Sequence, residues 1–178
     1  MSEPLTVPLR ASGATRALLA RLDELGIASS TIEHAPAFTV EDGEAVMGHL
    51  PGVHIKNLFL CDAKKVMWLV TMPWNRVVDL KKLPGMIGAA RLSFGSADRL
   101  MRVLGVAPGS VTPFAVINDT MHQVNVILDA WMMRQEIINA HPLVNTMTTS
   151  LKSADLMKFF AATGHQPRLV ELDPVLAA

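Results

Sequence analysis

A single cysteine, Cys61, is present in the whole 178-residue chain. One cysteine forms no internal disulfide, which is typical of proteins in a reducing cytosol. The chain also has no apolar run of the ~20 residues that cross a bilayer. Its first residues, Met-Ser-Glu-Pro-Leu-Thr, lack the basic start and apolar core of a signal peptide. These absences predict a cytoplasmic protein without a membrane partner.

An excess of charge of either sign is absent as well. The 16 Lys and Arg side chains balance the 16 Asp and Glu side chains. Proteins that wrap long nucleic acids need many basic contacts to phosphates, so the balance argues against that class. It leaves open a small basic patch that contacts one end of a nucleic acid. Half of the residues are hydrophobic, which indicates a compact globular protein and not a disordered one.

The common catalytic and nucleotide-binding motifs are also missing. The sequence contains no Gly-x-Ser-x-Gly nucleophile elbow, no Gly-x-Gly-x-x-Gly fingerprint and no phosphate-binding loop signature. Its histidines do not follow the spacing of a metal site, and one cysteine does not complete a zinc site. We therefore expect no metal and no organic cofactor.

Capping residues and hydrophobic patterns predict a mixture of helices and strands. Helices are expected at 12–25, 39–47, 76–87 (broken at 84–85), 96–104 and 153–163. Strands are expected at 27–34, 53–61, 66–72, 91–94, 114–118, 124–128, 137–140, 146–151 and 169–172. The predicted pairs are 53–61 with 66–72, 114–118 with 124–128, and 137–140 with 146–151.

These elements do not alternate as they do in a doubly wound sheet. The expected fold class is therefore α+β, a single domain with a mixed, mostly antiparallel sheet or partly closed barrel flanked by helices. Residues 1–11 are expected to form a flexible N-terminal arm, and 12–178 the domain. The runs 53–61 and 66–72 are apolar on both faces, which is typical of central strands covered on each side.

The segment 105–114 reads Gly-Val-Ala-Pro-Gly-Ser-Val-Thr-Pro-Phe and predicts a shaped loop. Gly109 has access to backbone angles closed to other residues, and it lets a ligand approach the main chain. Pro108 and Pro113 stiffen the loop on either side. The backbone N–H groups of residues 109–112 could then converge on an oxygen atom. An ordinary connection between a helix and a strand has the same composition, so both interpretations stay open.

Lys56 lies within the predicted strand 53–61, where a lysine is costly to bury without a partner. One interpretation is an edge-strand lysine that blocks aggregation. The other is a cation that lines a pocket for a phosphate or a carboxylate. Strand alternation places Lys56 on the same face as His54, and Asn57 on the opposite face.

His141 precedes Pro142, which favours an extended backbone at the histidine. It lies between the predicted strands 137–140 and 146–151. A hydrogen-bonded structural histidine and a site histidine are both compatible with this position.

Three motifs, taken together, resemble the YbaK/ProX family of aminoacyl-tRNA deacylases, which is related to the editing insertion of bacterial prolyl-tRNA synthetases. They are Lys56-Asn57, Gly109-Ser110-Val111-Thr112-Pro113, and His141-Pro142-Leu143-x-Asn145 before a Thr-rich segment. The similarity covers nearly the whole chain. Within the family the motifs look most like the free-standing alanyl-tRNA(Pro) deacylases called PrdX or ProXp-ala.

This resemblance implies a hydrolase that cleaves the ester of mischarged Ala-tRNA(Pro). Its partner would be the acceptor end of tRNA(Pro), with prolyl-tRNA synthetase as a further candidate, and it would bind no DNA. The Gly109 and Ser110 amides would bind the scissile carbonyl oxygen, and Lys56 the 3′-terminal phosphate or ribose. His141 would bound the pocket and orient the aminoacyl group. Substrate binding is expected of Asn57, Phe38, Thr112 and Asn145.

Editing suits the physics of amino-acid selection. A missing methylene is worth only ~1–3 kcal/mol of discrimination, so a pocket built for proline does not exclude alanine well. A second pocket that admits alanine and rejects proline supplies the missing selectivity.

Three alternatives remain at this point. The first is a Cys-tRNA(Pro) deacylase of the YbaK type, and the second is a non-catalytic homologue that binds tRNA or a synthetase. The third is a DNA-binding regulator, for which the expected helix 96–104 is weakly basic because it carries only Arg99 and Arg102.

Overall fold

The computed structural model describes residues 11–172, so the predicted arm lies outside it except for Ala11. The helices are α1 (Gly13–Glu24), α2 (Val40–Met47), α3 (Leu83–Ile87), α4 (Ala97–Leu104), the 3₁₀ helix η1 (Pro113–Asn118), α5 (Ala130–Met133) and α6 (Ser153–Thr163). The strands are β1 (Ser29–Glu33), β2 (Val53–Asp62), β3 (Met67–Pro73), β4 (Leu92–Phe94), β5 (Val124–Asp129), β6 (Ile137–Ala140), β7 (Met147–Lys152) and β8 (Arg168–Val170).

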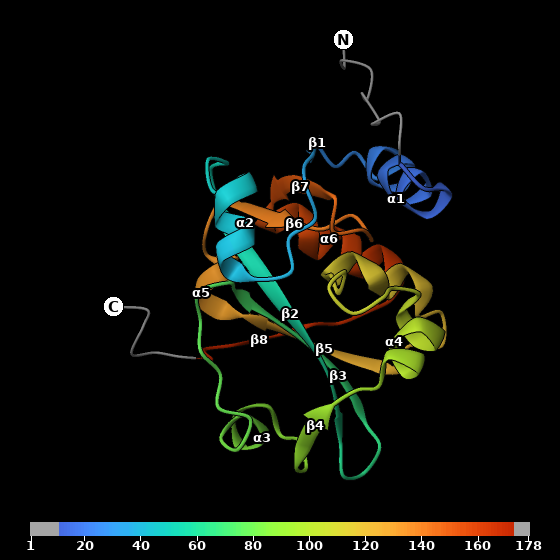
Figure 1. Cartoon of the computed structure of the whole chain (residues 1–178). Coiled ribbons are helices and arrows are strands. Elements are labelled where there is room, and N and C mark those ends of the chain that lie inside the picture. Colours follow the sequence, from blue (N-terminus) through green and yellow to red (C-terminus); the bar gives the residue numbers. More distant parts are fainter. Residues whose placement is uncertain (1–10, 173–178) are drawn as a thin grey trace.

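These strands form one mixed sheet in the order β1-β7-β6-β2-β3-β5-β8, with β4 attached to β2 outside this path. The hairpin β2–β3 is antiparallel, as predicted, and so is the pair β6–β7. The pairs β2–β6, β3–β5 and β5–β8 are parallel. The sheet of the described residues is open and helices flank it (Figure 1), so the α+β class is confirmed and the closed-barrel alternative is not.

Strand β2 has an interruption in its pairing that matters for the site. On the side away from β3, it pairs with β6 only at Val53 and His54, and with β4 only from Leu60 to Asp62. Within residues 11–172 the middle of β2 therefore has a strand neighbour on one side only. Lys56 lies in this segment and pairs with Met72 of β3, so it belongs to an inner strand and not to an edge strand of the sheet.

Three of the predicted helices are confirmed together with their N-caps, and a fourth is confirmed with a different N-cap. The side chains of Ser12, Thr39 and Ser96 each accept a hydrogen bond from the backbone three residues later, at the starts of α1, α2 and α4. The last helix, α6, begins at Ser153 itself with Lys152 as its N-cap, one residue earlier than predicted. Gly164 ends α6 in the left-handed conformation, as expected.

The predicted strand 114–118 is wrong, because these residues form η1. Thr112 precedes this helix in an extended conformation, and its hydroxyl accepts a hydrogen bond from the Phe114 amide. Pro113 occupies the first turn, where its missing N–H is tolerated. The predicted partner strand, β5, instead pairs in parallel with β3 and β8. A short buried apolar run looks the same in a strand and in a buried helix, and the pattern alone could not separate them.

The predicted helix 76–87 is wrong in its first half. Only Leu83–Ile87 is helical, and Pro84 stands in its first turn instead of breaking a longer helix. Gly88 ends α3 in the left-handed conformation.

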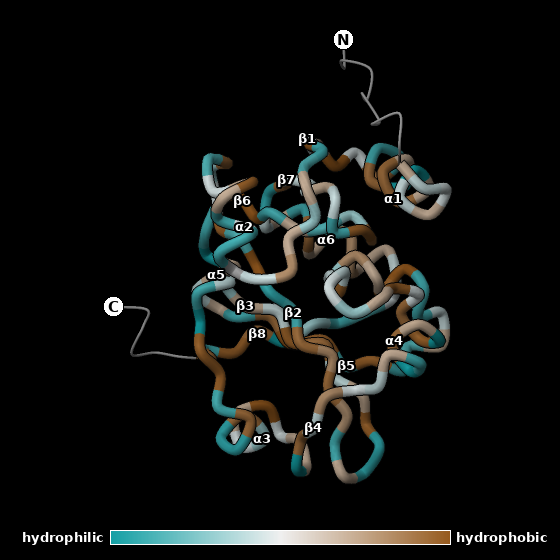
Figure 2. The backbone as a smooth tube through the Cα atoms, in the orientation of Figure 1, coloured by the Kyte–Doolittle hydropathy of each residue, from teal (hydrophilic) through white to brown (hydrophobic). Residues whose placement is uncertain are grey.

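Two hydrophobic cores cover the two faces of the central strands. The larger core joins the sheet to α1, α4, η1 and α6 through side chains such as Leu18, Phe114 and Phe159. The smaller core packs α3 against β2, β3 and β5, with Leu60 and Ile87 fully buried. Figure 2 shows the hydrophobic stretches gathered along these central strands. Each helix within residues 11–172 is too short or too polar to span a membrane.

Candidate functional site

A cavity of about 270 Å³ borders the interrupted middle of β2. Five of the eight predicted site residues line it, namely Lys56, Asn57, Gly109, His141 and Phe38. They come from β2, from the loop between α4 and η1, from the end of β6 and from the segment before α2. The fold therefore brings together residues that are far apart in the sequence, as the resemblance implied.

The ammonium group of Lys56 has a defined place beside this cavity. It donates a hydrogen bond to the backbone carbonyl of Arg76, in the segment that follows β3. Burial lowers the pKa of Lys56, because a desolvated ammonium is less stable than a hydrated one. The Arg76 side chain is itself buried, with Asp129 at 3.9 Å and the Trp131 ring centroid at 5.5 Å. Lys56 is thus held by a backbone carbonyl whose own residue is anchored in the protein interior.

Asn57 joins the loop between α4 and η1 to the sheet. Its Nδ2 donates to the carbonyl of Val111 at 3.0 Å, and its Oδ1 accepts from the Thr71 hydroxyl at 2.6 Å. Both ends of the amide are therefore bound within the protein. Asn57 lines the cavity, but its observed hydrogen bonds position the loop that carries Gly109.

The turn at Gly109 is tight. Gly109 has a φ of +90°, which strains any residue with a side chain. The N–H of Ser110 donates to the carbonyl of Ala107 at 3.0 Å and closes the turn. This bond conflicts with the expectation that the Ser110 amide binds a substrate oxygen.

His141 is largely buried in the cavity wall. Its Nδ1 lies 2.9 Å from the carbonyl of Met147, and a carbonyl only accepts, so Nδ1 carries the hydrogen. The neutral ring then has an unprotonated Nε2. Burial lowers the pKa of His141, and the neighbouring His34 and His54 lower it further. The histidine is therefore neutral at pH 7 and acts as a hydrogen-bond acceptor through Nε2.

The other predicted site residues lie at the rim or behind the wall. A Cβ atom added to Gly109 would lie 3.8 Å from Asn145 Nδ2 and 3.5 Å from the ring of Phe38, which is 73% exposed. Thr112, in contrast, is fully buried and caps η1, so the structure does not place it at the cavity. Ser110 does not line the cavity either.

Sequence analysis missed two residues of this site. Trp74 lines the cavity and stacks on His54, with ring centroids 4.5 Å apart. It also packs against α2, because a Cβ atom added to Gly43 would lie 3.0 Å from its ring. Met47, the last residue of α2, lines the cavity beside it. Neither residue belongs to a spacing pattern, so only the folded chain reveals them.

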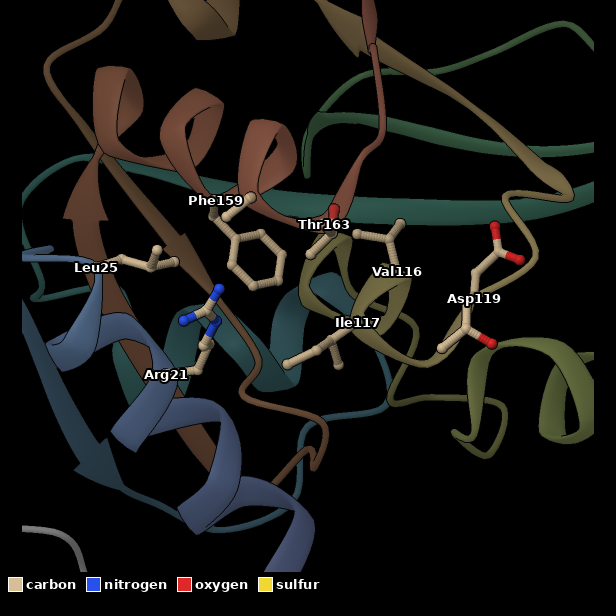
Figure 3. A pocket seen from close by; sticks show the side chains of 9 residues that line it. Arg21, Leu25, Val116, Ile117, Asp119, Phe159 and Thr163 are labelled. Atoms are coloured by element: carbon tan, nitrogen blue, oxygen red, sulfur yellow. The ribbon is translucent and has the colours of Figure 1, made fainter.

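A further cavity of about 190 Å³ lies between α1, η1 and α6 (Figure 3). Phe159, Val116 and Ile117 give it an apolar lining, and the Arg21 guanidinium stands at one side, 3.3 Å from Glu24. It contains none of the predicted site residues. Among residues 11–172, no group of three His, Cys, Asp or Glu side chains could hold a metal ion.

Comparison with known proteins identifies the fold and the family. The family described as "Aminoacyl-tRNA editing domain" matches residues 34–159. The chain belongs to this family. This editing domain is 38% identical to the "Prolyl-tRNA editing protein ProX" of Acetoanaerobium sticklandii over 160 residues, which span 89% of this chain and 98% of the relative.

One further relative and one solved structure also match this chain. The editing domain is 36% identical over 154 residues to the "Prolyl-tRNA synthetase associated domain-containing protein 1" of Danio rerio, which covers 85% of this chain and 84% of that protein. A crystal structure described as a candidate trans-editing enzyme for prolyl-tRNA synthetase has the same fold, with a TM-score of 0.66 at 17% identity. That match covers 90% of this chain and 98% of the other.

Gly109→Ala is expected to slow ester hydrolysis by the editing domain about tenfold. A Cβ atom at a φ of +90° strains the turn and shifts the N–H without removing it. A well-placed donor to an oxyanion supplies about 2.7–4 kcal/mol, and a tenfold effect is a loss of about 1.4 kcal/mol of it. Single-turnover rates for Ala-tRNA(Pro) measure the effect. Gly13→Ala is the matched control, because a Cβ atom there meets nothing within 4 Å. Equal rates for both variants would contradict the role of the Gly109 amide.

Proposed function

We propose that the editing domain hydrolyses the ester of mischarged Ala-tRNA(Pro) as a free-standing editing enzyme. The observation that carries the proposal is the convergence of Lys56, Gly109 and His141 on one cavity. These are the positions at which the sequence resembles the alanyl-tRNA(Pro) deacylases. The name of the 38% identical ProX relative supports the prolyl-tRNA editing part of this proposal.

Each of these residues has a role that its surroundings support. The Gly109 amide binds the carbonyl oxygen of the ester and stabilises the charge that develops there. Lys56 is a localised cation at the cavity and binds the 3′-terminal phosphate or ribose of the tRNA. His141 bounds the cavity and orients the aminoacyl group as a neutral acceptor. Hydrolysis then needs a placed water molecule and no covalent nucleophile.

Prolyl-tRNA synthetase is proposed as a partner on separate grounds. The relative from Danio rerio is named for a "prolyl-tRNA synthetase associated domain". The selectivity argument also connects editing with prolyl-tRNA synthetase, because alanine enters any pocket that is built for proline.

The test compares hydrolysis of Ala-, Cys- and Pro-charged tRNA(Pro) by the same enzyme preparation. Fast loss of alanine with retention of proline is the expected result. Faster loss of cysteine would move the enzyme to the Cys-tRNA(Pro) branch of the family. Failure to hydrolyse any of the three esters would leave a tRNA-binding homologue and contradict the proposal.

A further inference from the structure

A second, smaller cavity of about 20 Å³ adjoins the large one. The two share lining residues, among them Asn57, Trp74 and His141. His54 and Thr148 line only the smaller one. One water molecule requires roughly 10–15 Å³ of such space and a few polar partners. The smaller cavity therefore has the size and the polar lining to hold one water molecule beside the substrate.

His54 presents an unpaired acceptor at this position. The residue is 7% exposed, and its Nε2 is buried without a hydrogen-bond partner in the part of the chain that the structure describes. A hydrogen bond to the backbone of Leu50 raises the pKa of His54, although burial lowers it more. Because Nε2 has no partner among the described residues, the bonded nitrogen is Nδ1, which donates to the carbonyl and leaves the lone pair on Nε2. Stacking on Trp74 fixes the ring plane. Buried polar atoms are nearly always satisfied, so Nε2 requires a partner other than residues 11–172, and a bound water molecule would fill that role.

His141, which also lines the smaller cavity, has the same pattern of hydrogen bonding as His54. Its Nδ1 donates to Met147, and its ring lines both cavities. Two histidines with unprotonated Nε2 atoms thus line one water-sized cavity, and each can accept a hydrogen from the same water molecule.

We propose that the smaller cavity binds the hydrolytic water and that His54 is its general base. The inference rests on the proposed function. The water oxygen forms a bond to the ester carbonyl carbon while one of its protons moves to Nε2 of His54. The tetrahedral intermediate then collapses, and the bond between the carbonyl carbon and the ribose oxygen breaks. The proton on His54 passes to that ribose oxygen, so the histidine ends the cycle neutral.

The electrostatic surroundings keep both histidines in the basic form. Burial is the main cause that lowers the pKa of His54, and His49 lowers it further. Burial and the imidazoles of His34 and His54 act in the same direction on His141. The neutral state therefore persists below pH 6.5, and hydrolysis should lose rate only in more acidic solution.

His54→Leu tests the proposal, because leucine fills the space without accepting a proton. Single-turnover hydrolysis of Ala-tRNA(Pro) should fall about 100-fold, a typical loss for a general base. The enzyme concentration at half-maximal rate should stay unchanged, since His54 does not line the cavity that holds the tRNA end. The dependence of the rate on pH should also change: the decline that the wild type shows in acidic solution should not have the same form in His54→Leu. His49→Leu is the comparison, since His49 is exposed and does not line the smaller cavity. Its maximal rate should equal that of the wild type, while loss of the His49 contribution raises the pKa of His54 and moves the decline in acidic solution to higher pH.

A wild-type rate and pH profile in His54→Leu would overturn the proposal while the editing function stands. An inactive wild-type enzyme would instead overturn the proposed function and this inference with it. Nitrogen NMR of the wild type tests the same point without a substitution. An unprotonated His54 Nε2 with magnetisation transfer to a long-lived water supports the proposal, and a protonated Nε2 at pH 7 overturns it.

Discussion

Lys56→Ala is expected to slow the hydrolysis of Ala-tRNA(Pro) by about 100–1,000-fold, the range found when a placed donor is removed. The ammonium group is the cation that lines the cavity, and the carbonyl of Arg76 fixes its position. Without it, the end of the tRNA loses a charged contact and the ester is no longer aligned with the Gly109 amide. Single-turnover rates at saturating enzyme measure the loss.

Lys64→Ala is the control for charge. Lys64 is an exposed lysine in the turn between β2 and β3, and its removal changes the net charge by the same amount. We expect this variant to hydrolyse the ester at the wild-type rate. If Lys56→Ala were as active as Lys64→Ala, the lysine would have no role in the site.

Asp129→Ala is expected to lower the free energy of unfolding by about 3–5 kcal/mol, the cost of removing one partner from a buried ion pair. Asp129 is fully buried, lies 3.9 Å from the Arg76 guanidinium and caps α5 through the amide of Met132. The variant should also lose activity, because the carbonyl of Arg76 positions Lys56. Urea unfolding followed by tryptophan fluorescence gives the stability.

Asp155→Ala provides the comparison for a surface carboxylate. Its partner, Lys158, is about half exposed at 3.6 Å, and such pairs contribute about 0–1 kcal/mol. A similar small loss in Asp129→Ala would contradict the anchoring of Arg76 by Asp129.

Local signals in the sequence predicted much of the fold. The N-caps Ser12, Thr39 and Ser96 and the glycine stop at Gly105 depend on hydrogen bonds within a few residues, and each lies where the pattern indicated. The β2–β3 hairpin is also local, since only residues 63–66 separate its strands. These features are decided by short stretches of chain, so the sequence alone was enough to predict them.

The remaining errors concern choices that depend on distant parts of the chain. Residues 114–118 are apolar enough for a strand, but packing against α4 and α6 buries them as η1. The parallel partners of β5 could not be predicted, because hydrophobic periodicity gives the face of a strand and not its neighbour.

The predictions for the site divide in the same way, into residues that motifs indicated and features that depend on the folded chain. Lys56, Gly109 and His141 were predicted from motifs, and they do line one cavity. The use of the Ser110 amide within its own turn could not be foreseen, because it depends on the conformation of the loop. The pairing of His54 with Trp74 also escaped prediction, since stacking across two strands follows from the register of the sheet.

The parallel pairing of β2 with β6 has a consequence for the newly synthesised chain. His141 follows β6 directly, and β6 joins β2 only at Val53 and His54. During translation the β2–β3 hairpin therefore emerges from the ribosome long before His141, which completes the cavity wall. A chain truncated before β6 would carry Lys56 and Gly109 but no working pocket. Under the proposed function, we expect deacylation to begin only after β6 and His141 have been synthesised, and its onset during refolding would report the joining of β6 to β2.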